Sequence, residues 1–190
     1  MKHNKILITT IVTALITFAV NPALIAADEV KPESTTAAAN ATADATFMTD
    51  ATRAGLMEIK AGDIAEGKTK RDNVKEFAKV MQRDHTDVNK NLQTLADRMT
   101  MKLPKDLGDH QPFIDGLKAK TDADFDRTYI AATVMSHHAC IGMFEKFAAS
   151  TKNADLKAFA ENTLPGLRTH LKNAEVLLET LGGAKGTAVK

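Results

Sequence analysis

Four polar side chains interrupt long apolar helical patterns in the sequence, one in each pattern. Apolar residues recur every three or four positions, as on the buried face of a helix, and one strongly polar residue stands near the middle. These residues are Glu58, His85, His137 and His170. Carboxylate and imidazole groups are ligands of Zn(II), Cu(II) and Fe(II). Burying any one of them alone costs on the order of a few kcal/mol, and a shared metal ion would offset that cost.

The four residues are predicted to share one layer of a helical core. Counted from the turns between them, their heights differ by no more than about one or two turns, at a rise of about 1.5 Å per residue. Antiparallel helices pack about 8–10 Å apart, so side chains of this length can meet in the middle. We therefore expect Glu58, His85, His137 and His170 to form a metal site.

A structural role for the same layer stays open. A Glu–His hydrogen-bond cluster with one trapped water would also satisfy these polar groups. Asp84 precedes His85 and projects to a neighbouring helix face. There its carboxylate could accept a hydrogen bond from a metal-binding imidazole and orient the ring.

A second group of candidate ligands lies in the segment MSHHACIGM. Successive residues of a helix point about 100° apart, so His137 and His138 cannot both face the core. The soft donors Met135, Cys140 and Met143 close to imidazoles would favour Cu(I). The alternative is that Cys140 and Met143 are packing residues and that His138 lies at the surface.

Four long predicted helices position these residues, over 46–68, 72–99, 123–150 and 154–181. A connection rich in proline and glycine separates the second from the third and carries a short helical piece over 113–119. No stretch shows the sustained alternation of a strand. The sequence therefore predicts an all-α fold, a four-helix bundle over 46–181 with a longer connection between helices two and three, as in ferritin-like bundles.

The segments outside the bundle have other compositions. Residues 1–27 have the layout of a secretory signal peptide, with a basic start, an apolar run and small residues before a cleavage site near Ala26 or Ala27. This predicts a periplasmic or secreted protein, with an uncleaved membrane anchor as the alternative. Residues 28–45 have no apolar face and are predicted to be a flexible linker. Residues 182–190 are predicted to be a loose tail.

Composition excludes several classes of function. The formal net charge is +1, and the chain has eight Phe, one Tyr and no Trp. Neither a basic field nor a stacking platform for nucleic acid is present. A single cysteine cannot form an internal disulfide or a paired-cysteine zinc site. No phosphate-binding loop, nucleophile elbow or HExxH motif occurs, so an enzyme is less expected than a binding protein.

The run VKEFAKVMQRDHTDVNKNLQTLA resembles the exported bacterial family called domain of unknown function 4142, whose members are often labelled putative outer membrane proteins. Further similar segments are GLMEIK, FDRTYI and LKAFAENTLPGLRTHLKNA, and the resemblance covers about 46–181 in order. The family motifs fall on Glu58, Asp84-His85, His137, Pro165 and His170. The resemblance implies a ferritin-like bundle whose biochemical role is not established.

The sequence departs from ferritin-like di-iron proteins, which carry Glu-x-x-His pairs on two helices. Gln82 and Leu167 stand three positions before His85 and His170, which argues against a di-iron oxidase or an iron-storage cage. The segment MSHHACIGM is also similar to a stretch of another exported helical family, domain of unknown function 305, some of whose members are linked to copper and silver handling.

Three hypotheses follow for the function. The first is a periplasmic bundle that binds Zn, Cu or Fe and serves metal handling or stress tolerance. The second is a non-catalytic envelope protein that binds a protein partner and whose Glu/His layer is structural. The third is a redox enzyme with a degenerate mononuclear iron site. The sequence indicates neither the oligomeric state nor the partner.

Overall fold

The computed structural model describes residues 32–183, and every regular element in that range is helical. The elements are α1 Pro32–Lys68, α2 Asp72–Arg98, the 3-10 turn η1 Gly108–His110, α3 Gln111–Ala119, α4 Asp122–Ser150 and α5 Ala154–Gly183. The all-α fold class predicted from the sequence is confirmed. The predicted signal peptide over 1–27 lies outside the described residues, and so does most of the predicted C-terminal tail.

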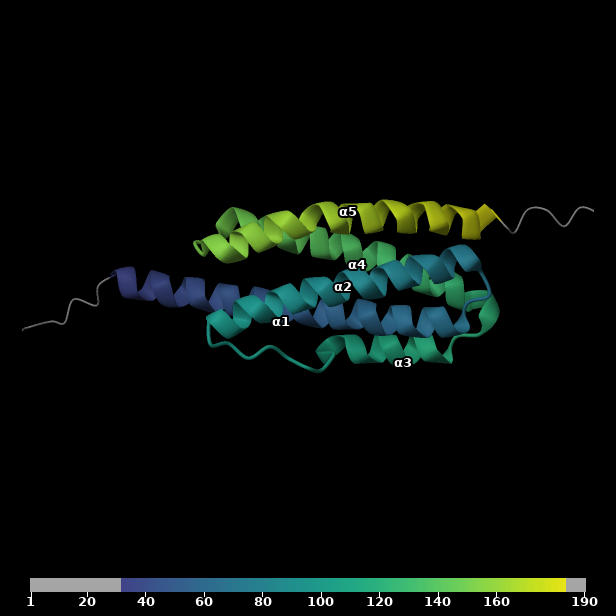
Figure 1. Cartoon of the computed structure of the whole chain (residues 1–190), viewed down its shortest axis with the longest axis horizontal. Coiled ribbons are helices and arrows are strands. Elements are labelled where there is room, and N and C mark those ends of the chain that lie inside the picture. The colour runs from purple at the N-terminus through teal and green to yellow at the C-terminus, as the bar shows by residue number, and fades with distance from the viewer. Residues whose placement is uncertain (1–31, 184–190) are drawn as a thin grey trace, which may run out of the picture.

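Four of the helices form an elongated antiparallel bundle (Figure 1). α1 and α2 make one hairpin, and α4 and α5 make the other. The hairpins pack so that α1 lies against α4 and α2 lies against α5. The long connection between α2 and α4 carries η1 and α3, and α3 lies on the outside of the bundle along α1 (Figure 1).

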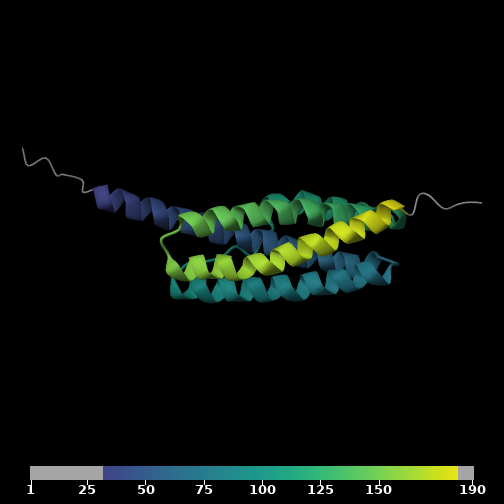
Figure 2. The same cartoon turned by 90° about the horizontal axis from the view of Figure 1, so that it is seen from above.

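The predicted linker over 28–45 is helical from Pro32 onward, which corrects the sequence prediction. α1 runs without interruption into the bundle, and its first turns project past the other helices (Figure 2). Alanine has the highest helix propensity, and proline is favoured in the first turn, so the segment needs no apolar face to continue the helix. Asp44 also anchors it, because its carboxylate accepts a hydrogen bond from the Thr151 hydroxyl at 2.8 Å.

Two apolar clusters fill the bundle, one toward each end. The first contains a group of phenylalanines in which Phe47 stacks on Phe147 with ring centroids 3.7 Å apart. The second contains Phe125 and Tyr129, also stacked, at 6.3 Å. Each of the four bundle helices passes from one cluster to the other. Along the chain, His85, His137 and His170 fall between the two clusters, and Glu58 follows Met57 of the second cluster.

Close contact between α1 and α2 sets the spacing of one side of the bundle. A Cβ atom at Gly62 would lie 3.0 Å from the Ala78 carbonyl oxygen, and one at Gly55 would overlap the Asn89 side chain. Because glycine has no Cβ, these two positions let the helices approach closely. Glu58 of α1 and His85 of α2 are both buried in the core of the bundle.

α5 continues through Pro165, which the sequence predicted to kink the helix or remove one backbone hydrogen bond. The proline ring is on the exposed side of the helix. There the missing N–H leaves a carbonyl that water can reach, so the helix need not break. Within residues 32–183, none of the helices has the length and apolar character needed to cross a bilayer.

Candidate metal centre

Three imidazole rings converge in the core between the two apolar clusters. His85 comes from α2, His137 from α4 and His170 from α5, and each side chain is buried, with 5%, 1% and 5% of its residue surface exposed. The ring centroids form a nearly equilateral triangle, with sides of 5.4, 5.4 and 5.5 Å. One ligand nitrogen from each ring lies within 4.8 Å of the other two. The three histidines can therefore hold a metal ion.

Hydrogen bonds orient two of the rings. The Nδ1 atom of His137 lies 3.0 Å from the carbonyl oxygen of Thr133, one turn earlier on α4. The Nε2 atom of His170 lies 2.9 Å from a carboxylate oxygen of Asp84. Because a carbonyl and a carboxylate can only accept, each of these nitrogens carries the proton. The lone pair is then on Nε2 of His137 and on Nδ1 of His170.

One nitrogen of each ring has no partner. His85 Nε2, His137 Nε2 and His170 Nδ1 are buried polar atoms without a hydrogen bond to another described residue. The lone pair is fixed on the unpartnered nitrogen in His137 and His170, and either tautomer is open to His85. A tetrahedral zinc ion with Zn–N bonds of about 2.0–2.1 Å places its ligand nitrogens about 3.4 Å apart. Small side-chain shifts from the present spacing would reach that geometry, so the donor set fits such an ion.

Burial keeps two of the imidazoles neutral at physiological pH. Desolvation, together with the positive charge that His137 and His170 would carry when protonated, lowers the pKa of His85 to about 3, and the Asp84 carboxylate opposes the shift. Desolvation also lowers the pKa of His137 to about 4, with charge on His170 adding to the effect and the Thr133 carbonyl opposing it. Neutral imidazole is the form that binds a metal.

Glu58 lies beside the site but behind His137. Its Oε1 atom is 3.6 Å from Nδ1 of His137, the ring nitrogen that is bonded to the Thr133 carbonyl, and it accepts a hydrogen bond from the Ser136 hydroxyl. Burial raises the pKa of Glu58 to about 7, against the lowering effect of the Ser136 hydrogen bond. The structure thus brings three of the four predicted ligands together and places Glu58 where it supports one of them.

Asp84 takes the supporting position on the other side of the site. One carboxylate oxygen accepts from His170 at 2.9 Å, and the other accepts from Nε of Arg83 at 2.7 Å. Partial burial would raise its pKa, but the hydrogen bonds from Arg83 and His170 outweigh that effect and lower it. Asp84 is therefore ionised, and it fixes His170 as carboxylates commonly fix metal-binding histidines.

The soft-ligand candidates point elsewhere. His138 is exposed and its Nε2 lies 3.5 Å from the Glu175 carboxylate on α5. Met135 is 74% exposed. Met143 and Cys140 pack against the phenylalanine cluster, and burial, with the Glu58 charge, raises the pKa of the Cys140 thiol to about 12. None of these four side chains joins the three histidines.

Two supporting groups could not be found from the sequence. Ser136 was visible as a polar neighbour of His137, but nothing indicated that it reaches Glu58 on α1. The Thr133 oxygen that binds His137 is a backbone carbonyl, which every residue has. Every histidine inside a helix has a backbone carbonyl four positions earlier, so the sequence does not show which histidines bond to that carbonyl.

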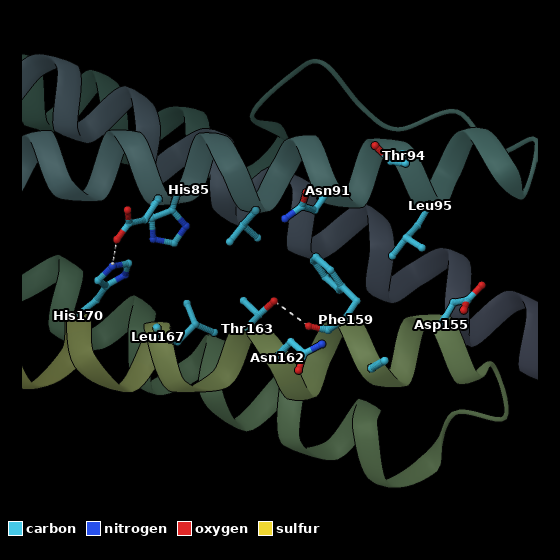
Figure 3. A pocket seen from close by; sticks show the side chains of 14 residues that line it. His85, Asn91, Thr94, Leu95, Asp155, Phe159, Asn162, Thr163, Leu167 and His170 are labelled. Atoms are coloured by element: carbon cyan, nitrogen blue, oxygen red, sulfur yellow. Dashed lines mark hydrogen bonds and ion pairs between the residues drawn. The ribbon is translucent and has the colours of Figure 1, made fainter.

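A groove leads from solvent to the histidines between α2 and α5. It has a volume of about 530 Å³. His85 and His170 lie at one end and Asp155 lies toward the other (Figure 3), and Asp84, which also lines the groove, is bonded to His170. His137 does not line it. The groove therefore reaches His85 and His170 from the α2–α5 side of the bundle, and the unpartnered ring nitrogens themselves are buried.

Comparison with known proteins assigns the chain to a family. Residues 29–177 match the model of the domain of unknown function called DUF4142, and the chain belongs to that family, as the sequence resemblance predicted. All the residues of the candidate centre lie within the matched range. No curated protein matches the chain, and no solved structure matches it.

Proposed function

We propose that this member of the DUF4142 family binds a divalent transition metal ion through His85, His137 and His170, and that it serves metal handling or stress tolerance outside the cytoplasm. The observation that carries the proposal is the convergence of three buried histidines, each with a ring nitrogen that has no hydrogen-bond partner. The opposite nitrogens of two rings are already held by Thr133 and Asp84.

The unpartnered nitrogens favour a bound ion. An unpartnered buried polar atom costs about 1–3 kcal/mol, and each of the three histidines carries one. The lone pairs of His137 Nε2 and His170 Nδ1 cannot bond to each other. A metal ion would satisfy all three nitrogens at once, with His85 in the tautomer that leaves Nε2 unprotonated.

The donor set restricts the kind of ion. Three neutral imidazoles suit Zn(II), Cu(II) or Fe(II), whereas Mg²⁺ and Ca²⁺ prefer oxygen ligands. Three protein ligands leave a coordination position free, as in catalytic rather than structural zinc sites. A bound ion would supply Lewis acidity or, for Cu and Fe, redox chemistry at that position. The surrounding groups orient the ligands: the Asp84 carboxylate holds His170, and the Thr133 backbone carbonyl and the Glu58 carboxyl group lie beside Nδ1 of His137.

The metal content of purified protein tests the proposal. The protein is prepared without a His tag, reloaded with Zn, Cu or Fe, dialysed and analysed for metal, beside the variants His137→Gln and His138→Gln. The two histidines are neighbours in sequence, but only His137 faces the convergent site, and His138 is exposed. We expect close to one ion per chain in wild type and His138→Gln, and loss of most of it in His137→Gln.

Circular dichroism shows whether His137→Gln is still folded. A folded His137→Gln variant that keeps its metal would refute the proposed ligand set. A wild-type protein that takes up none of the three ions would refute metal binding altogether. The remaining hypothesis would then be an envelope protein that binds a partner and whose polar layer fixes the helices in register.

Export is the second part of the proposal, and it is supported by the layout of residues 1–27 and by a family match that begins at residue 29. The intact mass of the protein recovered from the periplasm of a bacterial host checks it. We expect a chain that begins at residue 27 or 28. Recovery of the full-length chain from the cytoplasm alone would contradict export.

A further inference from the structure

We propose that the two helical hairpins part along the α2–α5 side of the bundle, with the α1–α4 side as the hinge, and that this motion lets the metal ion enter and leave. The inference rests on the proposed metal site and adds the route by which its ion exchanges. It starts from the burial of the three unpartnered ring nitrogens. An ion cannot reach buried nitrogens unless the surrounding helices move.

The site joins the two hairpins. His85 belongs to the α1–α2 hairpin, whereas His137 and His170 belong to the α4–α5 hairpin. Turns of three residues, over 69–71 and 151–153, hold each hairpin together. An ion bound by all three rings therefore bridges the hairpins. Parting the hairpins moves His85 away from the other two rings and exposes their nitrogens.

Packing within the hairpins is more extensive than packing between them. α1 contacts α2 along its length, as α4 contacts α5, and both interfaces are larger than those of α1 with α4 and of α2 with α5. The close approach at Gly55 and Gly62 belongs to the α1–α2 interface. Native proteins open first where contacts are few, and well-packed elements move as units. The hairpins are therefore the units that move.

The α2–α5 side is the one that opens. The groove of about 530 Å³ lies between these two helices, so part of their length is not packed together. Two polar pairs link the helices across this side, Asp84 with His170 and Arg98 with Asp155. The second pair is exposed, and exposed ion pairs contribute little to stability. Neither pair prevents a transient opening.

The α1–α4 side is held by the connection between the hairpins. This connection runs over 99–121 and carries η1 and α3. η1 packs on α1, and α3 packs on both α1 and α4 (Figure 1). Because these elements tie the hairpins together on that side, it acts as the hinge.

A chemical cross-link across the groove tests the route. In a Cys140→Ala background, which removes the native thiol, Asn91→Cys and Asn162→Cys are joined by a short bis-maleimide. These exposed residues face each other across the groove (Figure 3). The matched control joins Asp50→Cys of α1 to Ala139→Cys of α4, which are exposed and line one cavity on the opposite side. Each pair is also capped with N-ethylmaleimide, which modifies both thiols without linking them.

Two rates are measured for every linked and capped protein. Protein that was loaded with zinc before linking is mixed with excess chelator, and the loss of zinc is followed. Metal-free protein is treated with diethyl pyrocarbonate, which modifies neutral imidazoles. Mass spectrometry then gives the modification rates of His85 and His170, with the exposed His138 as the internal reference.

We expect the α2–α5 link to slow both zinc loss and modification of the buried histidines by roughly tenfold or more, because both require opening. His138 should react at an unchanged rate. The α1–α4 link should leave all rates within about twofold of the capped protein, since a hinge still allows the other side to open.

Unchanged rates in the protein with the α2–α5 link would overturn the inference. So would an α1–α4 link that slows them as much as the α2–α5 link does. If the protein takes up no zinc, the proposed metal site fails and the ion's route falls with it. The modification rates, which need no metal, then decide separately whether the hairpins part on the α2–α5 side.

Discussion

At the scale of single residues, the centre depends on which nitrogen of each ring carries the proton. Thr133 and Asp84 bind one nitrogen of His137 and of His170 and so leave the other as a lone pair directed at the common centre. Metal-binding histidines are usually held in this way, and the groups that hold them affect metal affinity nearly as strongly as the ligands do. The supporting residues are therefore as informative to mutate as the histidines.

Asp84→Ala should weaken metal binding by about 10–100-fold, because His170 loses the acceptor that fixes its ring. Competition with a colorimetric chelator measures the affinity. Asp87→Ala is the control, since Asp87 is an exposed aspartate three residues further along α2. Equal affinities in the two variants would show that Asp84 does not orient His170.

Glu58 gives a pH-dependent prediction for the metal-free protein. Burial raises its folded-state pKa to about 7 from 4.5, so the folded chain holds a proton that the unfolded chain releases between these values. Its contribution to stability is present below about pH 4.5 and is lost as the pH rises to about 7. Glu58→Gln keeps the shape of the neutral acid without the charge. We expect little change in unfolding free energy at pH 4.5 and a gain of up to roughly 3 kcal/mol at pH 8.

Urea unfolding of both proteins at the two pH values, in the presence of a chelator, measures this difference. The titration of His85 and His137 does not affect the difference between the two proteins, because both proteins contain these histidines. Their depressed pKa values destabilise wild type and variant alike below about pH 6.5, where the unfolded imidazoles take up protons first. A difference between the proteins that is the same at both pH values would contradict a buried, titrating Glu58.

At the scale of helices, periodicity predicted most of what the structure contains. The second, third and fourth long helices were expected over 72–99, 123–150 and 154–181 and occur as α2 Asp72–Arg98, α4 Asp122–Ser150 and α5 Ala154–Gly183. Each has an apolar face whose period is visible in one sequence. The first turns of α1 lack such a face, so the same reasoning assigned them to a linker. Alanine-rich sequence stabilises that part of the helix without a buried stripe.

The sequence predicted those residues of the site whose position depends only on which face of a helix is buried. Three histidines on buried faces at similar heights must approach one another, and they do. The position of Glu58 behind His137 depends on how α1 is rotated against α4, which periodicity does not determine. The pairing of Asp84 with His170 joins residues 86 apart in the chain. It depends on the packing of α2 against α5, and the sequence indicated only that Asp84 could support some imidazole.

At the scale of the whole molecule, the polar centre lies between two apolar clusters that span all four bundle helices. Burial of the clusters provides the main driving force for folding, so the bundle does not depend on the centre for its core. A protein built in this way can hold three unpartnered nitrogens in its metal-free form. If it has the proposed function, it would bind and release an ion without unfolding, in contrast to small domains that fold only with their metal.

The most direct test of the central claim is the X-ray absorption spectrum of the protein loaded with one equivalent of zinc. Three imidazole nitrogens at about 2.0–2.1 Å from the metal are expected, with one further light-atom ligand. The imidazole signal should decrease in His137→Gln and stay unchanged in His138→Gln. A zinc environment made of oxygen ligands alone, or one that does not respond to His137→Gln, would contradict a metal centre formed by His85, His137 and His170.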